Sequence, residues 1–121
     1  MHTVSETHVF RRAAAQAGMS DGDRARLVSF LAANPMAGEE IVGTGGCRKV
    51  RFAGRGKGKS GGYRVITFFT GEALPVFLMT VFSKGERANL SKPERNQLRL
   101  VTKAIVDEYR ARVVRAADKA G

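Results

Sequence analysis

Residues 47–70 read CRKVRFAGRGKGKSGGYRVITFFT, two strand-like runs joined by a basic segment rich in glycine. Charged and apolar residues alternate in Arg48–Phe52, which is the pattern of a half-buried strand. Tyr63–Thr70 is the most apolar and β-branched run, so we expect it at the centre of a sheet. After a short turn, Pro75–Phe82 returns as a third strand, and such short connections predict an antiparallel meander.

The segment between the first two strands concentrates positive charge. No acidic residue occurs between Glu40 and Glu72. Glycines interrupt the segment, so its backbone can approach a ligand closely. Cations on a bendable loop suit the phosphates of a polyanion, which points to RNA. The basic residues from the first strand to the second are Arg48, Lys49, Arg51, Arg55, Lys57, Lys59 and Arg64.

Composition bounds the class of protein. The chain has 121 residues, which suits one domain over residues 1–121. Its 43% hydrophobic and 26% charged residues are typical of a globular protein, whereas the net charge of +10 predicts attraction to nucleic acid or to an acidic partner. The single cysteine, Cys47, cannot form an intrachain disulfide, and we expect it to be a small buried side chain. With no apolar run of membrane-spanning length and no signal core, the predicted location is the cytoplasm.

Two short helices are predicted before the strands. Apolar residues recur at helical spacing in Glu6–Ala17, and Gly18 is a typical C-cap. A second helix is expected to begin at Ser20, with Asp23 completing a cap, and to end before Pro35.

A third helix is predicted after the strands. Ser91 is the expected N-cap, with Glu94 as its reciprocal partner and an apolar stripe following. Residues 110–121 are rich in alanine and in charges of both signs, which predicts a continuation of the helix that frays. The predicted fold is therefore α+β.

Three motifs carry a resemblance to a known family. They are GTGGxRKxR, GKGKSGGxRVI and SKxERxNLS. In this order, with the predicted elements, they resemble the RelE/HigB superfamily of type II toxin–antitoxin toxins, and the HigB-like branch most, over residues from about 2 to about 106. The resemblance implies two N-terminal helices, a twisted antiparallel sheet and a C-terminal helix. It also implies a ribosome-dependent endoribonuclease that cuts mRNA without a cofactor, and a cognate antitoxin, commonly of the helix-turn-helix type.

The resemblance also assigns site residues. Arg64 stands where the family contacts the scissile phosphate, and Lys84 is the basic residue after the third strand. This chain has Gly85 and Ser91 where family members carry an arginine and a tyrosine, so the resemblance supplies no general base. The family's remaining basic positions fall on Lys49, Arg51, Lys57 and Lys59.

The residues themselves can supply part of the chemistry of RNA cleavage. Attack by the 2′-hydroxyl needs a base, stabilisation of the phosphorane and an acid for the leaving oxygen. The planar fork of Arg64 matches phosphate oxygens. A lysine crowded by other cations can act as a base, so Lys57, Lys59 and Lys84 are candidates, Lys84 also as the acid. The basic segment has no carboxylate to hold a metal, and we predict none.

Several side chains have a second interpretation. Arg64 could pair with Glu72 on a solvated strand. Arg87 and Asn89, after the third strand, either contact RNA or cap the last helix. The other residues predicted to bind RNA are Arg48, Lys49, Arg51 and Arg55, of which Lys49 and Arg51 could instead be the exposed face of an edge strand. The aromatic residues Tyr63, Phe68 and Phe69 could stack on bases or pack in the core.

Two other functions remain open from the sequence. The chain could bind RNA or the ribosome without cutting, or it could be a ParE-like toxin that acts on gyrase. The concentrated cations of the basic segment argue against the second, because a protein target does not require them.

Overall fold

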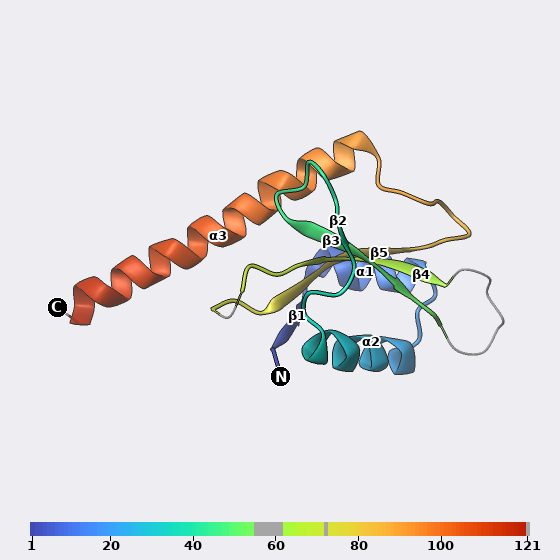
Figure 1. Ribbon diagram of the computed structural model, residues 1–121, viewed down its shortest axis with the longest axis horizontal. Coiled ribbons are helices and arrows are strands. Elements are labelled where there is room, and N and C mark those ends of the chain that lie inside the picture. Colours follow the sequence, from blue (N-terminus) through green and yellow to red (C-terminus); the bar gives the residue numbers. More distant parts are fainter. Residues whose placement is uncertain (55–61, 72, 121) are drawn as a thin grey trace.

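The computed structural model describes residues 1–54, 62–71 and 73–120. In these residues a five-stranded sheet, in the order β1-β5-β4-β3-β2, is combined with three helices (Figure 1). The elements are β1 Val4–Glu6, α1 His8–Gln16, α2 Asp21–Ala33, β2 Glu39–Glu40, β3 Cys47–Phe52, β4 Tyr63–Phe68, β5 Val76–Ser83 and α3 Lys92–Ala120.

The three predicted strands form the antiparallel meander expected from their short connections, and the apolar strand β4 is central. The sheet extends beyond this meander at one edge, where the strand β1, which was not predicted, adds to β5 in parallel. The Val76 N–H donates to the Thr3 carbonyl at 2.8 Å, and the Thr7 N–H donates to the Leu78 carbonyl at 3.2 Å. At the other edge, the two-residue strand β2 pairs antiparallel with β3.

The helices α1 and α2 cover one face of the sheet. Their apolar side chains and those of the strands form one core cluster. The first helix begins later than its apolar pattern predicted, because Glu6 belongs to β1 and Thr7 is the N-cap, accepting from the Phe10 N–H at 3.1 Å. The second helix begins as predicted, with the Asp23 N–H donating to the Ser20 hydroxyl at 3.0 Å. The cluster consists of Phe10, Ala14, Met19, Leu27, Leu31, Val50, Val65, Val76, Leu78 and Val81.

The helix α3 covers part of the opposite face. Its start is the predicted capping box: the Ser91 N–H donates to Glu94 at 2.8 Å, and the Glu94 N–H donates to the Ser91 hydroxyl at 3.3 Å. Cys47 lies fully buried in this second cluster, as predicted, and burial raises the pKa of its thiol to about 11. The cluster consists of Cys47, Ile66, Phe68, Met79, Phe82, Leu90 and Leu98.

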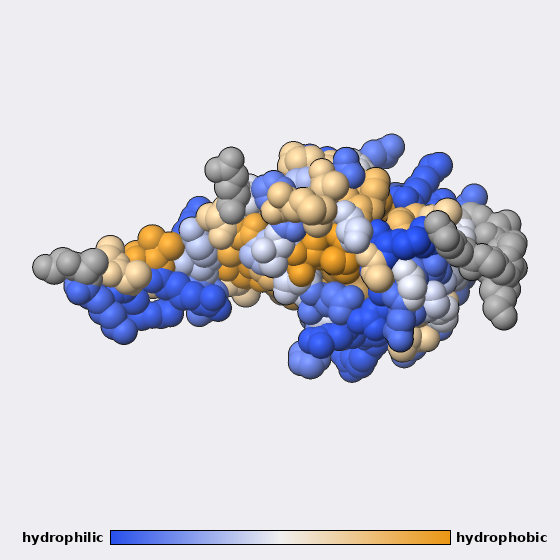
Figure 2. All heavy atoms as spheres, turned by 90° about the horizontal axis from the view of Figure 1, so that it is seen from below, coloured by the Kyte–Doolittle hydropathy of each residue, from blue (hydrophilic) through white to orange (hydrophobic). Residues whose placement is uncertain are grey.

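The second half of α3 extends beyond the sheet (Figure 1). The predicted helical continuation after residue 110 is confirmed as far as Ala120, and its fraying stays a prediction. Hydrophilic side chains line one side of this extension and apolar ones the other (Figure 2). Because α3 leaves the sheet in this direction, the ends of β3 and β4 near residues 52 and 63 are not covered by its projecting half.

Candidate nucleic-acid interface

Three of the predicted cationic residues share one face of the sheet. Arg51 of β3 lies directly opposite Arg64 of β4, and Lys49 lies two residues before Arg51. Alternation along a strand places all three on the same side as Cys47 and Ile66, which face α3. We call Lys49, Arg51 and Arg64 the cationic face. Like charges directly opposite on neighbouring strands disfavour the folded sheet, so this arrangement suits a surface that binds an anion.

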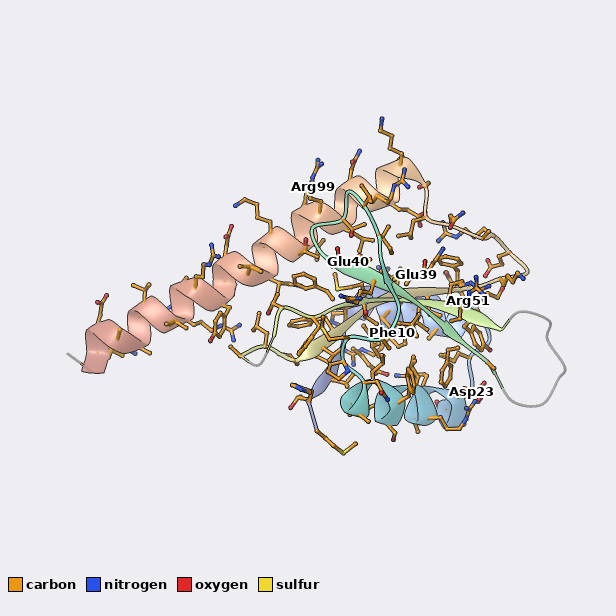
Figure 3. The ribbon with its side chains drawn as sticks, in the orientation of Figure 1. Phe10, Asp23, Glu39, Glu40, Arg51 and Arg99 are labelled. Atoms are coloured by element: carbon orange, nitrogen blue, oxygen red, sulfur yellow. The ribbon has the colours of Figure 1, made fainter. Side chains whose placement is uncertain are left out.

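The two arginines of the cationic face differ in burial. The Arg51 side chain is exposed, and Figure 3 labels it at the end of β3. Arg64 is only 6% exposed, and its Nη1 donates to the Tyr63 carbonyl at 3.3 Å. The predicted alternative partner, Glu72, lies outside the described residues, so that pairing is not tested. A partly desolvated guanidinium and an exposed one on neighbouring strands can both donate hydrogen bonds to a phosphate.

The loop between β5 and α3 supplies polar neighbours to this face. The Lys49 ammonium donates to Asn89 Oδ1 at 2.8 Å. This contact joins two residues that the sequence predicted separately, and it fixes the position of the lysine. Asn89 therefore acts on the cationic face through Lys49 rather than as a cap of the last helix.

Arg87 from the same loop takes the capping role that the sequence left open. Its guanidinium lies over the Phe82 ring, 4.4 Å from the centroid, and forms an ion pair with Glu94 at the start of α3. The hydrogen bond from Arg87, helped by those from Ser91, lowers the pKa of Glu94 to about 2. The same bond raises the pKa of Arg87. Phe82 lies directly opposite Arg64, so Arg87 and the Phe82 ring beneath it border the cationic face.

Lys84 follows the last residue of β5. Its N–H donates to the Gly62 carbonyl at 3.0 Å, so its backbone lies at the end of β4 that carries Arg64. The side chain is exposed. Lys84 and Arg64 therefore belong to the same end of the sheet, although the catalytic role of each stays a prediction.

Arg48 is separated from the other cations. It lies on the opposite side of β3, where its guanidinium donates to the Gly38 carbonyl at 3.0 Å and lies 3.6 Å from the Glu40 carboxylate. The alternation that places Lys49 and Arg51 on one face requires this, because Arg48 shares the face of Val50. The structure thus gives Arg48 a contact that holds β2 against β3. Arg55, Lys57 and Lys59 lie outside the described residues.

The aromatic residues mainly serve packing. Phe68 is buried in the α3-side cluster, so the core interpretation is confirmed for it. Phe69 lies against the first cluster and makes an edge contact with the His2 ring at 5.1 Å. Tyr63 packs against the same cluster, and burial, followed by the charge of Asp23, raises its pKa.

Sequence reasoning missed one charged residue beside the cationic face. Glu39 of β2 lies directly opposite Lys49, whereas its neighbour Glu40 lies opposite Arg48. Figure 3 labels both acids. The two acids therefore point to opposite faces, and Glu39 shares the face of Lys49. Two consecutive acids opposite two consecutive cations were the available signal, but a strand of two residues has no periodicity of its own.

Neither a metal-binding cluster nor a membrane-spanning helix is found in the described residues. Among residues 1–54, 62–71 and 73–120, no group of three or more His, Cys, Asp or Glu side chains is arranged to hold a metal ion. In the same part of the chain, no helix combines the length and the apolar character needed to cross a bilayer.

Comparison with known proteins places these features in context. The family model described as the RelE toxin of the RelE/RelB toxin–antitoxin system matches residues 2–120. Among solved structures, the chain is similar to a double arginine-to-alanine mutant of the Escherichia coli toxin RelE in the free state. The two are 18% identical, the match covers 70% of this chain and 85% of that one, and the TM-score is 0.47. The specific likeness to the HigB-like branch stays a prediction.

Proposed function

Because the chain belongs to the RelE family of toxins from toxin–antitoxin systems, we propose that it is an endoribonuclease that cuts mRNA on the ribosome and thereby inhibits translation. A toxin of this family has a cognate antitoxin, and we propose a helix-turn-helix protein for that role. The proposed site of action is the cytoplasm, where translating ribosomes are found. The reaction proposed here uses neither a metal ion nor an organic cofactor.

The observation that carries the proposal is the register of Arg51 with Arg64, with Lys49 on the same face. Three cations on one face, bordering the described ends of the basic segment at residues 54 and 62, can bind consecutive phosphates of a single strand. The fork of Arg64 can take two oxygens of the scissile phosphate, and its burial strengthens the interaction by excluding water.

The proposed chemistry is attack of the 2′-hydroxyl on the adjacent phosphorus. Arg64 and Arg51 would stabilise the charge that develops on the phosphorane oxygens, which is where preorganised donors accelerate a reaction most. Lys84, at the same end of the sheet, is the proposed donor of a proton to the departing 5′-oxygen. The ribosome would contribute by holding the message in an in-line geometry.

The test is expression of the chain without its antitoxin, followed by primer extension on cellular messages. The proposal expects cuts within translated codons, their loss with Arg64→Ala and their strong reduction with Lys84→Ala. Stalled translation on intact messages would contradict it, and so would a DNA-damage response, which would instead indicate a toxin acting on gyrase.

A second candidate function is RNA or ribosome binding without cleavage. It is favoured by the position of the two histidines, the usual acid–base residues at neutral pH. His2 packs against Phe69 and His8 opens α1, so neither belongs to the cationic face. The same primer-extension experiment separates this candidate from the nuclease.

A further inference from the structure

We propose that Glu39 is the general base of the cleavage reaction, the residue that takes the proton from the attacking 2′-hydroxyl. This inference rests on the proposed nuclease function. The resemblance supplies no general base, and the chemistry of the residues in the sequence offered only lysines for that role. It follows from the pairing of β2 with β3 rather than from any sequence motif.

Glu39 lies on the cationic face. Glu39 is the cross-strand partner of Lys49, and directly opposed residues of an antiparallel pair project to the same side. The ion pair between Glu40 and Arg48 lies on the other side of the sheet, which is independent evidence that Glu39 projects to the cationic face. Glu39 is therefore the acidic member of a surface that otherwise presents Lys49, Arg51 and Arg64.

The Glu39 carboxylate is available to accept a proton from a ligand. In the part of the chain that the structure describes, the exposed Glu39 side chain makes no hydrogen bond or ion pair. Its cross-strand neighbour Lys49 donates to Asn89 instead, at 2.8 Å. The adjacent acid, Glu40, lies 3.6 Å from Arg48 and so serves a structural contact. Of the two acids of β2, only Glu39 can accept a proton from a ligand on the cationic face.

The distance from Glu39 to Arg64, the proposed phosphate ligand, suits a shared substrate. Glu39 lies two strands away from Arg64 and two residues along, so their Cα atoms are roughly 12 Å apart by ordinary sheet dimensions. Glutamate and arginine side chains that reach toward each other across this distance can hold a phosphate and its neighbouring 2′-hydroxyl between them. Glu39 then acts on the attacking 2′-hydroxyl, and Arg64 acts on the phosphate that this hydroxyl attacks.

The strand β2 is anchored on both sides of Glu39. This matters because a base must be held in place to act. The Gly38 carbonyl accepts a hydrogen bond from Arg48 on one side of Glu39. On the other side, the Ile41 N–H donates to the Cys47 carbonyl at 2.9 Å. The two-residue strand is thus fixed at both ends against β3.

Proton transfer to Glu39 accompanies the attack on phosphorus in the proposed reaction. The 2′-oxygen loses its proton to the Glu39 carboxylate and forms a bond to phosphorus, while the bond from phosphorus to the 5′-oxygen breaks. The leaving 5′-oxygen takes a proton from Lys84 or from water. The products are a 2′,3′-cyclic phosphate and a 5′-hydroxyl. Glu39 then returns its proton to solvent, and Lys84, where it was the donor, takes a proton back from solvent.

A purely electrostatic role for Glu39 makes the opposite prediction. A carboxylate among cations weakens the binding of phosphate, so its removal should tighten RNA binding and leave cleavage as fast or faster. Loss of a general base should instead slow the chemical step by about 100-fold or more, with binding unchanged or tighter. The sign of the change in cleavage rate therefore separates the two roles.

The experiment compares Glu39→Gln with the matched control Glu40→Gln, which removes the same charge from the opposite face. Cleavage is measured under single-turnover conditions on ribosomes programmed with a defined message. Binding is measured on the same complex with a 2′-deoxy nucleotide at the cut site, which cannot be cleaved by this route. We expect Glu39→Gln to cut at least about 100-fold more slowly without weaker binding, and Glu40→Gln to cut within about threefold of wild type.

Two results would overturn the inference, and they are distinguishable. Cleavage by Glu39→Gln at the wild-type rate would remove Glu39 from the reaction while leaving the nuclease intact. A wild-type protein that binds programmed ribosomes but never cuts would remove the proposed function together with the role of Glu39. Partial activity of Glu39→Asp, with a shorter reach to the same hydroxyl, would support the inference further.

Discussion

Arg51 and Arg64 lie directly opposite each other on the antiparallel strands β3 and β4, and both project toward the face that α3 partly covers. Guanidinium groups on directly opposed residues project to the same side, so both can donate to one anion between them. The register of two strands thus brings together the two arginines of the proposed phosphate site, which are thirteen positions apart in the sequence.

Replacement of Arg64 tests this site most directly. We expect Arg64→Ala to reduce mRNA cleavage by about 100-fold or more, since one preorganised donor to a developing oxyanion has this effect. Arg64→Lys should restore only part of the activity because it lacks the planar fork. Cleavage is followed by primer extension, and circular dichroism verifies folding.

The matched control for this prediction is Arg48→Ala. Arg48 is also a strand arginine, but it faces Gly38 and Glu40 on the opposite side of the sheet. Its loss should reduce cleavage less than the loss of Arg64, because Arg48 acts only indirectly, by holding β2 against β3. Equal activity of Arg64→Ala and wild type would contradict the assignment of the phosphate site.

Binding to single-stranded RNA should depend steeply on salt. If about five phosphates are neutralised, the logarithm of the association constant should fall against the logarithm of salt concentration with a slope of roughly −3.5. Arg51→Ala should make this slope shallower by about 0.7, the value for one phosphate contact. Titrations by fluorescence anisotropy at several salt concentrations measure both, and a flat dependence would be incompatible with an RNA interface.

Gly38 should be intolerant of substitution. It has a positive φ of 94°, and a Cβ atom there would lie 2.5 Å from the Lys49 carbonyl oxygen. Gly38→Ala should therefore lower the free energy of unfolding by about 2 kcal/mol and shift β2 away from β3. Gly85→Ala, where a Cβ meets no atom within 4 Å, should change it by less than about 0.5 kcal/mol. Urea denaturation of both variants gives the comparison.

Glu94 should contribute stability that disappears in acid. Its folded-state pKa is lowered from 4.5 to about 2, chiefly by Arg87, so the contribution is complete above about pH 4.5 and is lost as the pH falls toward 2. The side chain is 38% exposed, and solvent screening limits the effect to about 1 kcal/mol. The difference in unfolding free energy between wild type and Glu94→Gln should therefore shrink across this range. A difference that stays constant down to pH 2 would show that the ion pair does not stabilise the fold.

The long elements of the fold could be predicted because their signals are local. The apolar run of β4 identified the central strand, and the hydroxyl caps at Ser20 and Ser91 marked two helix starts. The two edge strands could not be predicted, because β1 has three residues and β2 has two, too few for an alternating pattern. The parallel pairing of β1 depends on β5, which is far away in sequence.

The candidate site divides along the same line. The common face of Lys49 and Arg51 follows from alternation within one strand, and the same rule places Arg48 on the other side. The contact of Lys49 with Asn89 depends on the path of a loop, and the position of Glu39 depends on a pairing register. Neither relation has a local sequence signal, so both required the folded structure.

The parallel pairing of β1 with β5 has a consequence for the order of events during synthesis. The first strand to leave the ribosome has its partner at Val76–Leu78, so it waits until most of the chain has been translated. Contacts between such distant segments form late and slowly. A nascent chain interrupted before β5 therefore leaves β1 without its partner strand, and its sheet stays incomplete.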